Sequence, residues 1–237
     1  MRVKHAGKKE NLMYNKSNMI CKIGEWEHLE ALQKGQLFLW PIQYHIQNAK
    51  DYPELNYGDA EEAFFVKGKG KATIQGIEFA TVDIKKSSIK VHCPIFCAFE
   101  PDWQKTNEGK YTYIPDKRLQ NDFMREKNKK YGVILIEKYS FIKKCAEYFE
   151  KERINCYCGN INYTDDTGYS RLEPAINCAF KKRKRFAYQK EFRLLIDTEH
   201  KSKEPFIRNI GDLSQNSQII EADKFFSGNG IILEYTN

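Results

Sequence analysis

The stretch at residues 181–196 reads KKRKRFAYQKEFRLLI. It opens with the most basic run of the chain, residues 181–185, and closes with an apolar run that predicts a strand. Side chains alternate between the two faces of a strand, so we expect Gln189 and Glu191 on the same face. A concentrated positive charge beside a carboxylate at the mouth of a strand can bind an anionic ligand and act on it chemically.

The patterns on either side of this stretch predict a single α+β domain. Strands are expected at residues 19–23, 37–40, 91–99, 132–136, 160–163, 192–196, 205–210 and 230–235, with shorter pieces between 72 and 90. Helices are expected at residues 25–34 (ended by Gly35), at 119–129, and from an N-cap at Ser140 onward. Residues 51–62 are expected as a loop and residues 67–71 as a turn. The prediction is a mixed, mostly antiparallel sheet with a few flanking helices over residues 19–237, after a loosely ordered segment at 1–18.

The composition of the 237-residue chain, with 41% hydrophobic and 30% charged residues, is typical of a globular protein. Its net charge of +7 favours anionic partners such as RNA, DNA or nucleotides. No stretch approaches the roughly 18–20 apolar residues of a membrane helix, and no apolar region of a signal peptide follows the basic N-terminus. The seven cysteines follow neither a disulfide framework nor zinc-knuckle spacing. We therefore expect a cytoplasmic protein with free thiols and no metal.

A strand, a helix that ends at residues 32–35, a second strand and a late strand that opens with Gln-x-Glu follow one another along the chain. This layout resembles that of ADP-ribosyltransferases, enzymes that consume NAD. In that family the Gln-x-Glu signature carries the catalytic glutamate. The resemblance therefore implies Glu191 as the catalytic carboxylate and Gln189 as the residue that positions the acceptor. Lys22 lies on the expected first strand, where the family usually carries a His or Arg that holds the nicotinamide end.

Four short pieces of the chain also resemble a broad group of uncharacterised bacterial and phage proteins. They are Gly35-x-Leu37-Phe38, Tyr57-Gly58-Asp59-x-x-Glu62, Pro94-Ile95-Phe96-Cys97 and Tyr188-Gln189-Lys190-Glu191-Phe192-Arg193. This resemblance implies an enzyme of bacterial or phage conflict systems, in phage defence, counter-defence or toxicity, that modifies a nucleic acid or a protein.

The residues expected to bind NAD are Lys22, Tyr44, His45, Tyr188 and Arg193. The aromatic ones could stack on a nicotinamide or a base, although core packing would explain them equally well. The basic run could cradle a pyrophosphate or a nucleic-acid backbone through Lys181, Lys182, Arg183, Lys184 and Arg185. A plain structural alternative for Glu191 is a surface ion pair with Arg193 or Arg185, which would stabilise the fold little.

Two other functions stay open. A non-catalytic nucleic-acid-binding module of a mobile element would use the same basic run, interleaved with Phe186 and Tyr188. A magnesium-dependent nuclease would place its cation on the acidic turn at Asp59 and Glu62, because hard cations take carboxylate oxygens. A solvated acidic turn is the simpler interpretation of that segment.

Overall fold

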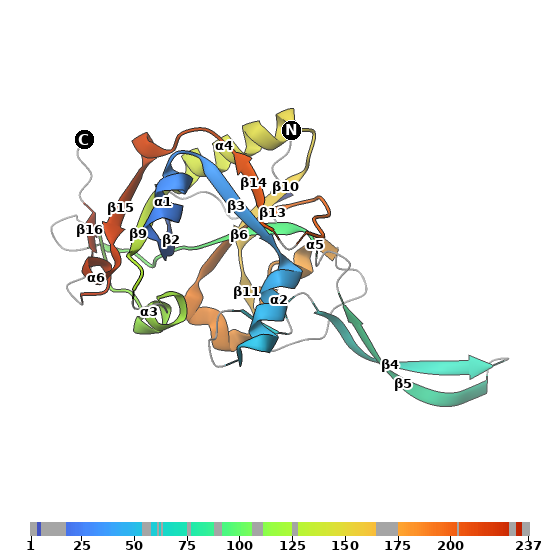
Figure 1. The fold of residues 1–237 in the computed structure, drawn as a ribbon. Helices are drawn as coiled ribbons and strands as arrows, with labels where there is room; N and C mark the ends of the chain where they lie inside the picture. The colour runs from blue at the N-terminus through green and yellow to red at the C-terminus, as the bar shows by residue number, and fades with distance from the viewer. Residues whose placement is uncertain are drawn as a thin grey trace.

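The computed structural model describes residues 4–5, 18–53, 58–60, 62, 64–74, 77–87, 92–105, 111–124, 128–164, 175–202, 204–227 and 231–233. Helices and a mostly antiparallel sheet follow one another along these ranges, which confirms the predicted α+β class (Figure 1). Most of the N-terminal segment at residues 1–18 lies outside the described residues. Within the described ranges, no helix is both long and apolar enough to cross a membrane.

The main sheet has nine strands in the described part of the chain, ordered β1-β10-β13-β6-β2-β9-β15, with β3 and β14 joined to it through β6. Their bounds are β1 Lys4–His5, β2 Met19–Glu25, β3 Gln36–Pro41, β6 Pro94–Phe99, β9 Tyr131–Glu137, β10 Cys156–Asn160, β13 Glu191–Ile196, β14 Phe206–Asn209 and β15 Ser217–Glu221. Its strand pairs are antiparallel except for β1 with β10. The smaller sheets are β4 (Phe64–Ile74) with β5 (Ile77–Ser87), β11 (Asn162–Tyr163) with β12 (Lys181–Lys182), and β7 (Gln104–Lys105) and β16 (Ile231–Leu233) on either side of β8 (Tyr111–Tyr113).

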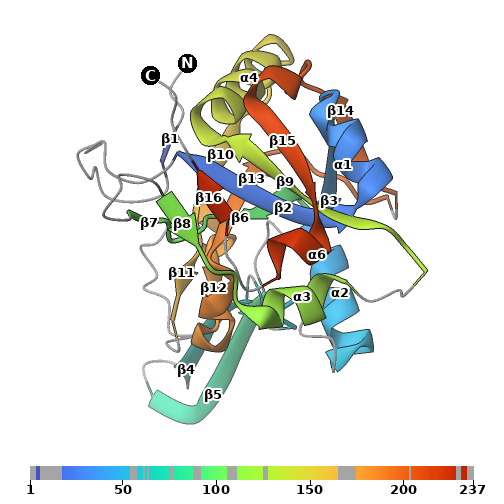
Figure 2. The ribbon, with the colours of Figure 1, turned by 90° about the vertical axis from the view of Figure 1, so that its left-hand side faces the viewer.

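Helices cover both faces of the main sheet, with α4 above it and α3 and α6 below it in Figure 2. Their bounds are α1 Trp26–Gln33, α2 Ile42–Asp51, α3 Lys117–Phe123, α4 Lys138–Lys151, α5 Ala175–Cys178, α6 Ala222–Phe225, and the 3-10 helices η2 Lys184–Gln189 and η3 Ser214–Asn216. Apolar side chains of α1 and α4 share one core with Phe96 and Phe192. On the opposite face, α3 and α6 belong to one apolar cluster and α2 to another.

One edge of β6 pairs with two strands that diverge from each other. β3 pairs with it at Pro94 and Ile95, whereas β2 pairs with it at Phe99. Between these pairings, residues 96–98 have no strand partner on this edge in the described part of the chain. The ammonium group of Lys22 on β2 instead donates a hydrogen bond of 2.8 Å to the Cys97 carbonyl oxygen.

The β4–β5 hairpin extends away from the rest of the molecule (Figure 1). Its backbone pairs run from Phe64 opposite Ser87 to Ile74 opposite Ile77. Residues 67–71, which were predicted as a turn, lie inside β4. That prediction was wrong because alternating lysine and glycine also fit an extended ribbon.

Two further local predictions need correction. No helix was predicted at residues 42–51, yet α2 buries Ile42, Ile46 and Ala49 on one side, at helical spacing. The next error concerns α4, which begins after Glu137 rather than at Ser140. The Glu137 carboxylate caps the helix, accepting hydrogen bonds of 3.0 Å from the Tyr139 backbone N–H and 2.6 Å from that of Ser140.

Candidate functional site

Strand β13 carries two charged residues into the interior. Arg193 is fully buried and lies opposite Cys97 of β6, while Glu191 is 5% exposed and lies opposite Phe99. They lie on the face of the sheet that carries α2, α3 and α6. A strand buried on both faces is normally apolar throughout. Charges at this place therefore need partners inside the protein.

Gln189 reaches the site by a route that the sequence did not predict. It is the last residue of η2, and β13 begins only at Glu191. Lys190, between them, has a left-handed φ of 43°, which turns the chain from the 3-10 helix into the strand. The prediction that Gln189 and Glu191 share one strand face was wrong. The turn nevertheless leaves both side chains within reach of Lys182.

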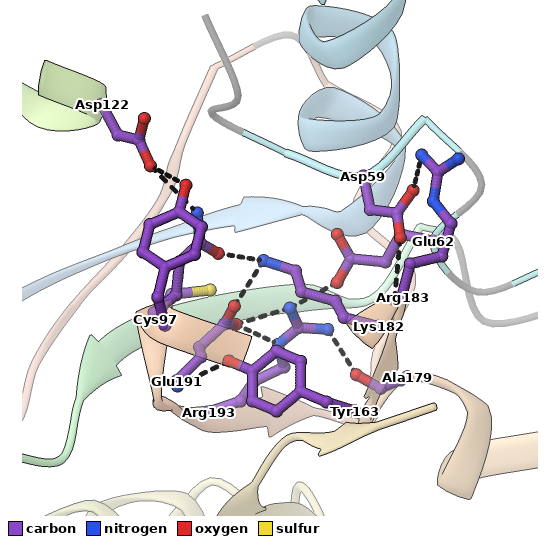
Figure 3. A network of polar contacts seen from close by, with 12 residues as sticks. Asp59, Glu62, Cys97, Asp122, Tyr163, Ala179, Lys182, Arg183, Glu191 and Arg193 are labelled. Carbon is purple, nitrogen blue, oxygen red and sulfur yellow. Dashed lines mark hydrogen bonds and ion pairs between the residues drawn. The ribbon is translucent and has the colours of Figure 1, made fainter. Parts of the chain in front are cut away.

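Lys182 links the two predicted catalytic residues, Gln189 and Glu191. Figure 3 shows its contact with Glu191. Its ammonium nitrogen lies 2.5 Å from Glu191 Oε2 and 3.3 Å from Gln189 Oε1, and its side chain is 5% exposed. The backbone is fixed here because β12 pairs with β11, with Lys182 opposite Tyr163. The Tyr163 hydroxyl oxygen in turn accepts a hydrogen bond of 2.8 Å from the Glu191 backbone N–H.

Arg193 holds the other oxygen of the Glu191 carboxylate. Its Nε and Nη2 atoms donate to Glu191 Oε1 at 2.8 and 2.5 Å, and Nη1 donates to the Ala179 carbonyl oxygen. Nη2 also forms an ion pair with Glu62 Oε1, an atom that accepts no well-aligned hydrogen bond from the described residues. The Glu191–Arg193 pair that was considered as a surface contact thus exists, but it is buried.

The acidic turn is buried rather than solvated. Asp59 is 1% exposed and Glu62 is 2% exposed. Arg183 pairs with Asp59 through its guanidinium group and through a backbone N–H hydrogen bond of 3.1 Å to Oδ2, while Arg193 pairs with Glu62. Each carboxylate therefore already faces an internal cation. No grouping of three or more metal-ligating side chains occurs among the described residues, and the nuclease hypothesis stays a prediction.

These contacts keep the cluster charged at neutral pH. Burial alone would raise the pKa of Glu191, but the charges of Arg193 and Lys182 outweigh it and hold the pKa below its usual value. Burial alone would lower the pKa of Lys182, but Glu191 and Glu62 hold it above its usual value. Burial, followed by the charges of Arg193 and Lys182, lowers the pKa of His45 to about 3. At neutral pH its imidazole is therefore uncharged.

A cavity of about 410 Å³ opens where β2 and β3 diverge from β6. Around Glu191, its polar wall includes Lys22, His45, Glu62, Lys182, Gln189 and Arg193, together with the thiol-bearing Cys97, and Glu25, His28 and Gln36 add further polar groups elsewhere in the wall. The rest of the wall is mainly apolar and comes from β2, β3, β6, α1 and α3. Both members of the predicted catalytic pair, and three of the predicted NAD-binding residues, therefore line one space.

The other predicted residues lie elsewhere. Tyr44 stacks on Trp40 at 4.1 Å between ring centres. Of these two residues, Trp40 lines the cavity and Tyr44 does not. Tyr188 lines a second, smaller hollow, together with Arg185. The five residues of the basic run differ in their pairing and in their exposure to solvent. Lys182 and Arg183 pair internally, Lys184 and Arg185 are exposed, and Lys181 is partly buried.

Three residues that contact the site were not predicted. Asp122 is 5% exposed and accepts hydrogen bonds from the Tyr188 hydroxyl and, at 3.4 Å, from Gln189 Nε2. Tyr163 contacts the Glu191 backbone, and Cys97 lies beside the Glu191 carboxylate, where burial and then this charge raise the thiol pKa to about 12. Cys97 belongs to the short piece at residues 94–97 described above, but no motif marks Asp122 or Tyr163 in the sequence, because they reach the site through helix packing and sheet pairing.

Comparison of the chain with protein-family models, with curated proteins and with solved structures gave no match. The geometry of the site is therefore the basis for a functional conclusion.

Proposed function

We propose that the chain is an ADP-ribosyltransferase-like enzyme that consumes NAD, with Glu191 acting at the nicotinamide ribose. One observation carries this proposal. A buried glutamate, kept ionised by Lys182 and Arg193, lines a cavity of about 410 Å³ whose wall also carries a third cation, Lys22.

The charges of the cavity wall favour an anionic ligand. Lys22, Lys182 and Arg193 share the wall with three carboxylates, Glu25, Glu62 and Glu191. Glu25 forms an ion pair of 2.7 Å with Lys129, which does not line the cavity, so two carboxylates are left to balance the three cations. Burial lowers the pKa of Lys22, so an anion bound beside it would stabilise its charged form. The pyrophosphate of NAD is such an anion, and lysine and arginine are its usual partners in proteins.

The size and apolar wall of the cavity suit the remainder of a dinucleotide. Small-molecule sites commonly measure about 300–1,000 Å³ and combine an apolar lining with a few polar groups. Phe38 and Trp40 of β3 belong to this lining and offer aromatic surface to a nicotinamide or an adenine. The neutral His45 imidazole can exchange a hydrogen bond with the ligand without adding charge.

The ionised Glu191 carboxylate suits the chemistry of transfer from NAD. The bond between ribose C1′ and the nicotinamide nitrogen breaks, nicotinamide leaves as a neutral molecule, and positive charge develops on the ribose. A carboxylate at that place stabilises this charge and accepts a hydrogen bond from a ribose hydroxyl. Lys182 and Arg193 fix the carboxylate beforehand, so little reorganisation accompanies the reaction.

The test is nicotinamide release from NAD by the wild type and by Glu191→Gln. The variant keeps the shape of the side chain and removes its charge, so we expect the rate to fall about 100- to 1,000-fold. NAD binding, measured as thermal stabilisation, should persist because the wall becomes more positive. The control is Glu147→Gln, which removes a carboxylate from the exposed surface of α4. An unchanged rate in folded Glu191→Gln refutes the proposal.

Lys22→Met gives an independent check, because Glu191 also belongs to buried ion pairs. Lys22 lines the cavity and contacts the Cys97 carbonyl oxygen. We expect this variant to stay folded and to bind NAD at least about tenfold more weakly, as expected when a charged contact to a phosphate is lost. NAD affinity within twofold of the wild type would place the dinucleotide elsewhere.

A further inference from the structure

A second hollow, of about 270 Å³, lies between α3 and η2. Its wall is formed by Arg118, Asn121, Asp122, Arg185, Phe186 and Tyr188. The hollow is connected to the cavity through Gln189, which lines the cavity and donates from Nε2 to Asp122 Oδ2 at 3.4 Å. Gln189 also contacts Lys182, the partner of Glu191. A molecule in the hollow would therefore lie next to the proposed catalytic pair.

Two arginines make the hollow suitable for an anion. Arg185 is exposed, lies 4.7 Å from the centre of the Phe186 ring, and forms no ion pair with any carboxylate in the described ranges. Arg118 lies 4.0 Å over the Tyr188 ring and pairs with Asp116 through Nε and Nη2, which leaves Nη1 outside that pair. An aromatic ring behind a guanidinium restricts its orientation while its N–H groups point outward in the guanidinium plane.

The carboxylate inside the hollow offsets only part of this charge. Asp122 is buried, its Oδ2 atom accepts hydrogen bonds from Tyr188 and Gln189, and its charge adds to the larger effect of Asp116 in raising the pKa of Arg118. Lys117 and Lys184, next to hollow residues along the chain, are both exposed and continue the positive charge past the hollow.

We propose that this hollow holds a phosphate of a single-stranded nucleic acid that accepts the ADP-ribose group; the acceptor role rests on the proposed function. Guanidinium groups bind phosphate through paired N–H donors. Positive charge on both sides of the hollow suits a chain of phosphates better than an isolated one. The flexible backbone of a single strand lets one phosphate enter the hollow while its neighbours follow the surface. In the transfer, a nucleophilic atom of the acceptor bonds to ribose C1′ as nicotinamide leaves, and the acceptor's proton passes to solvent.

The test measures binding of 12-nucleotide DNA and RNA strands by fluorescence anisotropy over a range of salt concentrations. Arg118→Glu/Arg185→Glu should bind at least about tenfold more weakly at low salt, with a salt slope smaller by about 1.4, because each single-strand phosphate contact contributes about 0.7. The control, Lys143→Glu/Lys201→Glu, makes the same change in net charge at exposed lysines outside the hollow. It should stay within about threefold of the wild type. Arg185→Glu alone, which leaves the Arg118–Asp116 pair intact, should show about half of the change in slope.

Several results would overturn the inference. They are a double variant that binds as tightly as the wild type, a control that loses as much affinity, and tighter binding of a phosphopeptide of equal charge. Nicotinamide release without an acceptor is measured in parallel. If the wild type releases no nicotinamide, the proposed function is refuted. The dependence of strand binding on Arg118 and Arg185 then still tests whether the hollow binds a phosphate. If nicotinamide is released but neither strand binds, or the bound strand gains no ADP-ribose, the acceptor assignment fails alone.

Discussion

Arg193→Met tests whether one side chain holds the buried ion cluster together. Arg193 donates two hydrogen bonds to Glu191 and one to the Ala179 carbonyl oxygen, and it pairs with Glu62. Methionine keeps part of the apolar stem and removes every donor. Removing one partner of a buried ion pair costs about 3–5 kcal/mol, because the remaining charge has lost its compensation. Glu191 retains Lys182, so most of this penalty falls on Glu62.

We therefore expect the free energy of unfolding to fall by about 4 kcal/mol. For a chain of this size, that corresponds to a midpoint of thermal unfolding lower by about 8–16 °C. The assay is urea unfolding followed by circular dichroism. The slope of the unfolding free energy against urea concentration should be the same in the variant and the wild type, which confirms that unfolding exposes the same surface in both.

Glu62→Gln and the double variant Arg193→Met/Glu62→Gln complete a double-mutant cycle with Arg193→Met. Glu62 accepts no well-aligned hydrogen bond from the described residues, so Glu62→Gln alone should cost about 1–2 kcal/mol. Arg193→Met/Glu62→Gln should be at least about 2 kcal/mol more stable than the sum of the single effects predicts, because it removes both charges. A loss below about 1 kcal/mol in Arg193→Met, or simple additivity, would refute this account.

Two further predictions concern pH and backbone geometry. Between pH 7.5 and 5.5, the wild type should lose up to about 1.4 kcal/mol more unfolding free energy than His45→Gln in urea titrations. The unfolded chain binds a proton near pH 6.5, whereas the folded pKa of about 3 keeps the imidazole neutral, so folding is penalised as pH falls; equal losses would contradict this. Gly35→Ala should lower the unfolding free energy by about 2 kcal/mol or more, because φ is 95° and an added Cβ would lie 2.5 Å from the Gly211 carbonyl oxygen. Thermal unfolding measures this loss, with Gly24→Ala as the milder comparison, and a loss below about 1 kcal/mol would contradict it.

Several strands and the first helix could be predicted because their patterns are local, whereas β15 at Ser217–Glu221 was not predicted. Residues 132–136 were predicted as a strand and lie within β9, and residues 25–34 nearly match α1. Gly35 was expected to end that helix, and its positive φ and the 2.9 Å hydrogen bond from its N–H to the Leu32 carbonyl oxygen show that it does. Apolar periodicity and a glycine after the last turn depend only on near neighbours in the sequence.

The arrangement of charges could not be predicted in the same way. Nothing within five consecutive basic residues shows that Lys182 turns inward; this depends on the pairing of β12 with β11. The segment around Asp59 and Glu62 has the composition of a solvated loop, but its arginine partners lie far along the chain. Gln189 was placed on a strand because the period of two was extended past the left-handed Lys190.

The divergence of β2 and β3 from β6 has a consequence for how such a protein can change over evolution. The space between the strands is set by their backbones, and Phe38 and Trp40 line it without belonging to the apolar clusters of the core. Substitutions at these two positions should therefore alter the shape offered to a ligand while leaving the ion cluster on β13 intact. Descendants of this chain could change the molecule they recognise and keep the same buried carboxylate, so the shape of the cavity and the ion cluster can diverge independently.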